Sequence, residues 1–240
     1  MLWAIALLMA VAAAGASAAD VDAAAGPGLQ DEMSAALALE PRPSRGARLF
    51  AERCSRCHGA DAAGSRDGAV PALAAQNYRY LVKQIVDFRD EERFVAPVHD
   101  EDARTALHGP QGIADIAAYL AALQPGATPQ TGSGRHVERG ASLFRAACES
   151  CHGEAAVGSD ALGIPSLHGQ HYSYLVRQIV DIGRSHRFNA PPDLTLLLRD
   201  MPREDIQAVA DYLSRLSGAD SILTRLESVE GAASPARAGR

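Results

Sequence analysis

The sequence contains few residues of the two sulfur-bearing types, and their positions limit its chemistry. Its 240 residues include four cysteines, all in two Cys-x-x-Cys pairs, so none remains for a separate structural disulfide. Of the four methionines, Met1, Met9 and Met33 precede both pairs, and only Met201 follows one. Basic residues do not outnumber acidic ones. The net charge of −6 argues against nucleic acid as a partner.

Each cysteine pair is followed directly by a histidine. The two motifs are Cys54-Ser55-Arg56-Cys57-His58 and Cys148-Glu149-Ser150-Cys151-His152. Two thiols at this spacing, followed by histidine, are the signature of c-type haem attachment. Each cysteine adds to one vinyl group of the porphyrin, and the histidine is the proximal iron ligand through its Nε2 atom. The sequence therefore predicts two covalently bound haem c groups, with His58 and His152 as iron ligands.

Cys-x-x-Cys pairs also occur in redox disulfides and in zinc sites. Four cysteines in two pairs could form one zinc ribbon. The pairs of a ribbon are separated by roughly 15–20 residues, whereas His58 and His152 lie 94 positions apart (152 minus 58). This separation, and the histidine after each pair, favour haem over zinc or a redox disulfide.

The offset of 94 residues continues well beyond the motifs. Residues of the first copy that recur at this offset are Gly46, Leu49, Phe50, Pro71, Leu73, Gln76, Tyr78, Tyr80, Leu81, Val82 and Gln84-Ile85-Val86-Asp87. About half of the positions match without a gap. Such a repeat indicates a duplicated haem domain.

Each copy contains Cys-x-x-Cys-His-Gly, Pro-x-Leu, a Gln-x-Tyr-x-Tyr-Leu segment and a final amphipathic helix. In this arrangement the chain resembles the dihaem cytochrome c4 family over roughly residues 44–124 and 136–217. The resemblance implies an all-α fold of two tandem class I cytochrome c domains, a periplasmic address and single-electron transfer. It also implies that the carbonyl groups of Pro71 and Pro165 accept a hydrogen bond from Nδ1–H of His58 and His152. It implies further that Gly46, and the matching Gly140, allow a close crossing with the last helix of each domain, which carries Tyr119 or Tyr212.

The remaining segments suggest an exported protein with two linked domains. Residues 1–19 resemble a secretory signal with cleavage near Ala18 or Ala19, and an uncleaved anchor is the alternative. The expected order is a signal peptide (1–19), a flexible lead-in (20–43), domain one (44–124), a linker (125–135), domain two (136–217) and a largely disordered tail (218–240). Helices are expected over 78–88, 113–123 and 204–216.

The sixth iron ligands depart from the family pattern. The family places a ligand methionine where this chain has Pro97-Val98-His99 and Pro191-Pro192-Asp193. Alignment of the copies backwards from the final helices sets His108 opposite Met201. Both residue types ligate haem iron, so Met201 is the candidate in domain two, and His108 or His99 in domain one. His186 is a further candidate in domain two.

Two arginines, Arg93 and Arg187, follow matching helices and could bind haem propionates. No pairing of a nucleophile with a base is visible, so the sequence predicts an electron carrier, not an enzyme. Redox proteins such as a terminal oxidase or a dehydrogenase are the expected partners. The pattern is compatible with peripheral membrane association and carries no prediction of oligomeric state. The alternative function is a haem enzyme or a sensor that binds gas or peroxide at an open iron.

Overall fold

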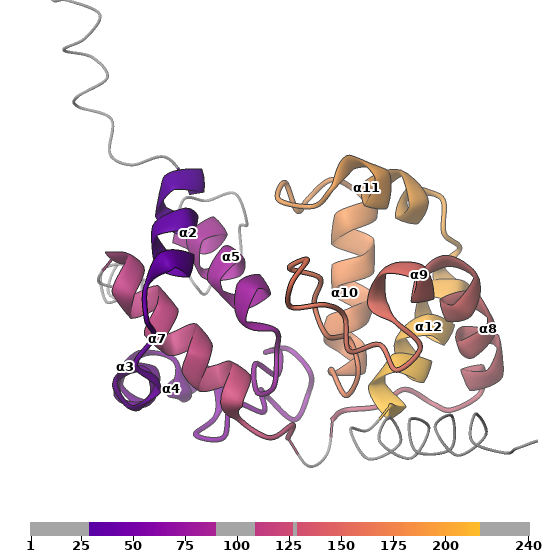
Figure 1. Cartoon of the computed structure of the whole chain (residues 1–240). Coiled ribbons are helices and arrows are strands. Elements are labelled where there is room, and N and C mark those ends of the chain that lie inside the picture. Colours follow the sequence, from indigo (N-terminus) through magenta and orange to yellow (C-terminus); the bar gives the residue numbers. More distant parts are fainter. Residues whose placement is uncertain (1–28, 90–108, 127–128, 217–240) are drawn as a thin grey trace, which may run out of the picture.

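The computed structural model describes residues 29–89, 109–126 and 129–216, and within these ranges the chain is helical (Figure 1). The described ranges contain no β-strand, only one isolated bridge between Ser159 and Ile164. The helices are α2 (Leu29–Ala38), α3 (Pro43–Arg53), α4 (Ser55–His58), α5 (Tyr78–Arg89), α7 (Gly109–Ala122), α8 (Val137–Ala147), α9 (Glu149–His152), α10 (Tyr172–Gly183), α11 (Pro192–Arg199) and α12 (Arg203–Arg215). The predicted all-α fold is confirmed.

Domain one is built around the crossing of α3 and α7. Gly46 lies at the crossing, where a Cβ atom would stand 2.0 Å from the backbone oxygen of Asp115. Only a residue without a side chain permits this approach, as the family resemblance implied. Beside it, the rings of Phe50 and Tyr119 pack with centroids 5.6 Å apart. The crossing thus holds the start of the haem motif against the last helix of the domain.

Domain two repeats this arrangement with α8 and α12. A Cβ atom on Gly140 would stand 2.0 Å from the backbone oxygen of Ala208. The rings of Phe144 and Tyr212 again pack with centroids 5.6 Å apart. The two domains therefore place their Cys-x-x-Cys-His motifs on equivalent scaffolds.

Two helices differ from the sequence prediction. Residues 29–38, expected to belong to a flexible lead-in, form α2, which packs against α5 and α7. Ala36 is fully buried there, and Arg89 pairs with the largely buried Glu32. In domain two, α11 was not predicted. It packs along α10, and the backbone oxygen of Leu198 comes so close to Gly183 that a Cβ atom there would lie 2.7 Å away.

The predicted helices otherwise lie close to their expected positions. The segments expected over 78–88, 113–123 and 204–216 form α5, α7 and α12, each within a few residues of the predicted ends. Among the described residues, no helix combines the length and the apolar character needed to cross a bilayer. The predicted signal peptide, all of the predicted tail and the first residues of the predicted lead-in lie outside the described ranges.

Candidate haem-binding sites

The first Cys-x-x-Cys-His motif forms a helical turn directly after α3. Cys54 ends α3, and its N–H donates to the Phe50 oxygen at 2.8 Å. Its own carbonyl oxygen accepts from the N–H groups of Cys57 and His58, at 3.1 and 3.0 Å. One helical turn therefore separates Cys54 from His58 and brings both to the same side. Gly59, with φ of +77°, then redirects the chain.

The second motif has the same local geometry. The carbonyl oxygen of Cys148 accepts from the N–H groups of Cys151 and His152, at 3.2 and 3.0 Å. Gly153, with φ of +75°, follows the turn as Gly59 does in domain one. The duplication seen in the sequence is thus preserved in the backbone hydrogen bonds of both sites.

Each motif histidine is held by the proline that the sequence singled out. His58 Nδ1 lies 3.0 Å from the Pro71 oxygen, and His152 Nδ1 lies 3.1 Å from the Pro165 oxygen. A carbonyl oxygen only accepts, so Nδ1 carries the proton and Nε2 carries a lone pair. Burial lowers the pKa of both histidines, and the bond to the proline oxygen offsets part of this effect. A neutral imidazole with fixed orientation is the form that binds a metal.

The environments of Cys54 and Cys148 do not suit a redox-active cysteine, and the four cysteines do not form a zinc site. Burial, helped by the neighbouring Cys57, raises the pKa of Cys54 to about 11. Burial and the neighbouring Cys151 likewise raise the pKa of Cys148. Reactive redox cysteines instead have lowered pKa values. Within the described residues, which include all four cysteines, no cluster of His, Cys, Asp or Glu could hold a metal ion, so a zinc ribbon is not formed.

The surroundings of the motifs fit a large apolar group with polar edges. Cys54 and Leu73 are partly buried against the core of domain one, as Cys148 and Leu167 are in domain two. The hydroxyl of Tyr78 is buried and has no hydrogen-bond partner among the described residues. Burial raises the pKa of Tyr78, so its hydroxyl stays a neutral donor. An unpaired buried donor beside an apolar surface is consistent with a haem, which supplies both apolar carbon and propionate oxygen.

The candidate sixth ligands are only partly within the described residues. His99, His108 and Arg93 lie outside them. Met201 is half-buried between α11 and α12. His186 is exposed and its Nδ1 lies 3.9 Å from Asp181 on the same helix end, which is the setting of a surface histidine.

Arg187, a predicted propionate partner, has protein neighbours in both domains. Its guanidinium donates to Tyr80 Oη at 2.9 Å and to Gln84 Oε1 at 2.8 Å, both in domain one. It also donates to Gln178 Oε1 at 3.1 Å and Asn189 Oδ1 at 2.8 Å. The arginine therefore links the two domains, and Tyr80 lies at the interdomain surface.

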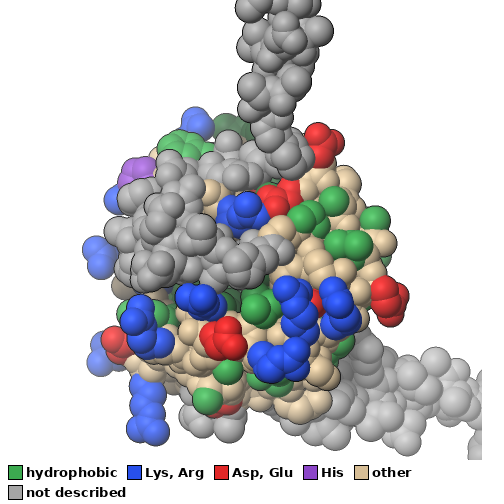
Figure 2. All heavy atoms as spheres, turned by 90° about the vertical axis from the view of Figure 1, so that its left-hand side faces the viewer, with side chains coloured by type: hydrophobic (Ala, Val, Ile, Leu, Met, Phe, Trp, Pro, Cys, Tyr) green, Lys and Arg blue, Asp and Glu red, His purple; other side chains and the backbone are tan. Residues whose placement is uncertain are grey.

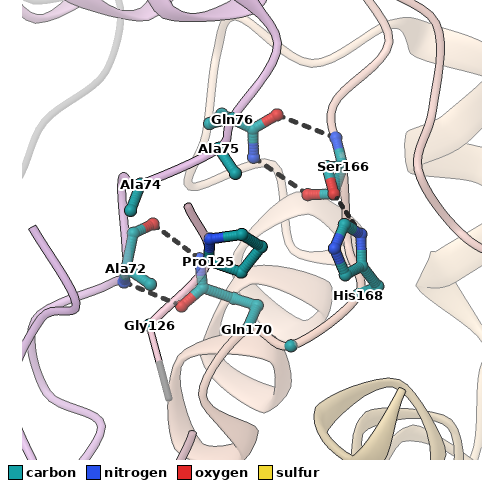
Figure 3. A pocket seen from close by; sticks show the side chains of 10 residues that line it. Ala72, Ala74, Ala75, Gln76, Pro125, Gly126, Ser166, His168 and Gln170 are labelled. Atoms are coloured by element: carbon teal, nitrogen blue, oxygen red, sulfur yellow. Dashed lines mark hydrogen bonds between the residues drawn. The ribbon is translucent and has the colours of Figure 1, made fainter. Parts of the chain in front are cut away.

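Sequence reasoning missed most of the interdomain contact, which repeats with the same offset of 94. Asn77 donates to the Val157 oxygen at 3.0 Å, and its counterpart His171 contacts the Ala63 oxygen through Nε2 at 2.7 Å. Since Nδ1 of His171 accepts from the N–H of Gln130 at 2.9 Å, the ring is neutral with its proton on Nε2. Figure 3 shows a neighbouring part of this contact, where Gln76 and Gln170 reach across the boundary. Both glutamines were visible in the sequence as an identical repeated pair.

Two family models match the chain, one for each domain. Residues 43–124 match the family described as cytochrome c, and residues 135–213 match cytochrome C oxidase, cbb3-type, subunit III. Each of these ranges contains one Cys-x-x-Cys-His motif.

Several known proteins are similar to the whole two-domain unit. Cytochrome c4 of Pseudomonas aeruginosa is 34% identical over 176 residues, which cover 68% of this chain and 83% of that protein. The thiosulfate dehydrogenase electron acceptor of Stutzerimonas stutzeri (strain A1501) is 32% identical over 188 residues, which cover 71% of this chain and 82% of that protein. The crystal structure of reduced recombinant cytochrome c4 from Pseudomonas stutzeri superposes with a TM-score of 0.66 and 26% identity, covering 74% of this chain and 100% of that one.

These matches agree with the paired sites described above. Two cytochrome c domains with c4 relatives imply one covalent haem c in each domain and a role in electron transfer. The chain belongs to the dihaem cytochrome c4 family.

Proposed function

We propose that the chain is a periplasmic dihaem electron carrier in which His58 and His152 are the proximal iron ligands. The observation that carries this proposal is the repeated contact between the motif histidine and a proline oxygen, at 3.0 Å in one domain and 3.1 Å in the other. In both domains this contact leaves Nε2 as the free ligand atom directly after a Cys-x-x-Cys turn.

The protein's contribution is attachment, orientation and exclusion of water. When bound, each haem supplies the exchange of one electron at its iron. In domain one, Cys54 and Cys57 tether the group, and the Pro71 oxygen fixes the plane of the His58 ring. In domain two, the same tasks fall to the pair Cys148 and Cys151 and to the contact between His152 and the Pro165 oxygen. The neutral imidazoles are held in place before electron transfer, so little protein reorganisation accompanies it.

The sixth ligands differ between the domains in this proposal. Met201 ligates the second iron, supported by its half-buried position between α11 and α12. His108 or His99 ligates the first iron, since both lie between the first haem motif and the final helix of domain one and no methionine lies there. Thioether and imidazole ligands give haem irons different potentials, and the thioether raises the potential. The two haems are therefore inequivalent, with the higher potential in domain two.

The partners we propose are a dehydrogenase as electron donor and a terminal oxidase as acceptor. One relative is named an electron acceptor of thiosulfate dehydrogenase, and two relatives are cbb3-type oxidase subunits. A periplasmic location is supported by the signal-like residues 1–19.

Figure 2 shows Lys and Arg side chains grouped on one face of domain one, and α3 and α4 expose Arg48, Arg53 and Arg56. Such a face suits docking by an acidic surface of a partner.

Optical and EPR spectra of the holoprotein, with and without carbon monoxide, test this proposal. A carrier with two six-coordinate irons gives two low-spin signals, and the reduced protein does not bind carbon monoxide rapidly at neutral pH. Rapid binding would instead favour the alternative function, a haem protein that binds gas or peroxide at an open iron. Stopped-flow mixing with a thiosulfate dehydrogenase then tests the donor, since fast reduction is expected at low ionic strength and slower reduction in high salt.

A further inference from the structure

The peptide group that holds each motif histidine is itself held by the opposite domain. Pro71 supplies the oxygen that faces His58, and the N–H of the same peptide belongs to Ala72. This N–H donates to Oε1 of Gln170, in domain two, at 3.0 Å. We propose that Gln170 is a positioning residue for His58, acting across the domain boundary through the peptide between Pro71 and Ala72.

The mirror-image contact exists on the other side. The oxygen of Pro165 faces His152, and the N–H of Ser166 completes that peptide. Ser166 N–H donates to Oε1 of Gln76, in domain one, at 2.8 Å. Each domain therefore completes the support of the other domain's histidine. The two glutamines are the repeated pair at the offset of 94 residues.

Both glutamine amides are held in a single orientation (Figure 3). Gln170 Nε2 donates to the Ala72 oxygen at 2.9 Å, and Gln76 Nε2 donates to the Ser166 oxygen at 2.9 Å. Each Oε1 also accepts the N–H of the residue that follows it, at 2.9 Å in both cases. Backbone N–H groups only donate, so these bonds fix which amide atom is oxygen. Both side chains are largely buried, with 9% of Gln76 and 8% of Gln170 exposed.

The expected effect follows from the polarisation of the peptide group. A peptide whose N–H donates to a strong acceptor carries more negative charge on its oxygen, and hydrogen bonds in such a chain strengthen one another by about 10–30%. A stronger hydrogen bond from Nδ1–H to the proline oxygen makes the imidazole a better electron donor at Nε2. That donation favours the oxidised iron, so removal of the glutamine raises the potential of the haem in the opposite domain.

The inference rests on the proposed ligation by His58 and His152, and it predicts a crosswise pattern. Gln170→Met removes the amide at similar size, and should change the potential of the domain-one haem. Gln76→Met should change that of the domain-two haem. We expect the equilibrium constant for reduction to rise by about two- to fourfold, which is roughly 20–35 mV at 59 mV per tenfold. The haem in the variant's own domain should change less.

The experiment is a redox titration of the holoprotein in which the NMR signals of each haem are followed separately. The matched control is Tyr80→Phe, which removes one interdomain hydrogen bond of 2.9 Å to Arg187 without touching either proline peptide. It should leave both potentials near those of the wild type. In the reduced protein, the Nδ1–H resonance of His58 should move upfield in Gln170→Met and stay in place in Gln76→Met. Gln170→Asn, whose shorter amide cannot reach Ala72, is a second variant with the same expected result.

Three results would overturn the inference. Equal shifts of both haems, a shift confined to the variant's own domain, or the same shift in Tyr80→Phe would each mean that the glutamines only hold the domains together. The failure of the proposed function is distinguishable, because it would appear in the wild type. A wild-type protein whose haems lack low-spin histidine ligation would refute the ligand assignment before any variant is compared.

Discussion

The close crossing of α8 and α12 makes Gly140→Ala a sharp test of the fold. A Cβ atom there would stand 2.0 Å from the Ala208 oxygen and 2.9 Å from Tyr212 Cβ, while ordinary contact begins at 3.4 Å. The helices would therefore have to separate by about 1.4 Å (3.4 minus 2.0). The nearest obstructing atoms belong to the backbone, so a side-chain rotation cannot relieve the contact.

Two opposing effects decide the magnitude. Alanine is the better helix former, which alone would stabilise the variant by about 1 kcal/mol. Overpacking costs about 1–3 kcal/mol and occasionally more, and here two helices must also withdraw from a core that includes Val209 and Leu213. We expect a net loss of about 2–4 kcal/mol. For a domain of this size, that corresponds to a fall in Tm of roughly 10–30 °C.

Thermal and guanidinium unfolding of the holoprotein, followed by circular dichroism, measures this loss. Limited proteolysis should locate the weakened region in domain two. Ser142→Ala, on the exposed side of the same helix, is the control and should change stability by less than about 0.5 kcal/mol. If Gly140→Ala unfolds at or above the wild-type temperature, the close helix crossing described here is wrong.

Three further predictions concern pH, attachment and ligation. Burial alone would raise the pKa of Asp115, but hydrogen bonds from Arg45, the Arg42 N–H and Gln111 outweigh this effect and lower the pKa. The ionised carboxylate therefore stabilises the folded protein above about pH 4, and this contribution is lost as the pH falls through the lowered pKa. Asp115→Asn should therefore destabilise by about 1–3 kcal/mol at pH 7 and by progressively less in acid, as urea titrations at several pH values would measure. Cys151→Ser should weaken haem attachment in domain two alone, so denaturing mass spectrometry should find many chains that carry one haem. Two haems on every chain would contradict the role of this thiol. Met201→Ala should lose the near-infrared sulfur-to-iron charge-transfer band and should lower only the higher of the two haem reduction potentials. The expected fall is on the order of 0.1 V, within the range of about 0.8 V that axial ligands span. A variant with unchanged potentials would exclude Met201 as a ligand.

The features that the sequence predicted are local or repeated. The Cys-x-x-Cys-His turns depend on residues within five positions, and the two glycines at the helix crossings were visible because both copies keep them. The contacts of Pro71 and Pro165 followed from the family resemblance. The motif turns could be read from spacing, whereas the roles of the prolines needed the family resemblance.

The features that were missed depend on packing between distant segments. Helix α2 lies in an Ala-rich stretch, and the full burial of Ala36 arises only from contact with α5 and α7. Arg187 donates to Tyr80 and Gln84 in the other domain, over a hundred positions away in the sequence, and its contact with a propionate stays a prediction. No local pattern marks such a contact. For Gln76 and Gln170, identity between the copies was the one available signal.

A potentiometric titration of the holoprotein, followed by optical spectroscopy, tests the central claim most directly. A dihaem carrier with inequivalent ligands takes up two electrons per chain in two separate one-electron waves, and its spectra stay low-spin throughout. The upper wave belongs to domain two. A single one-electron wave, or a high-spin reduced form that binds carbon monoxide at once, would contradict the account.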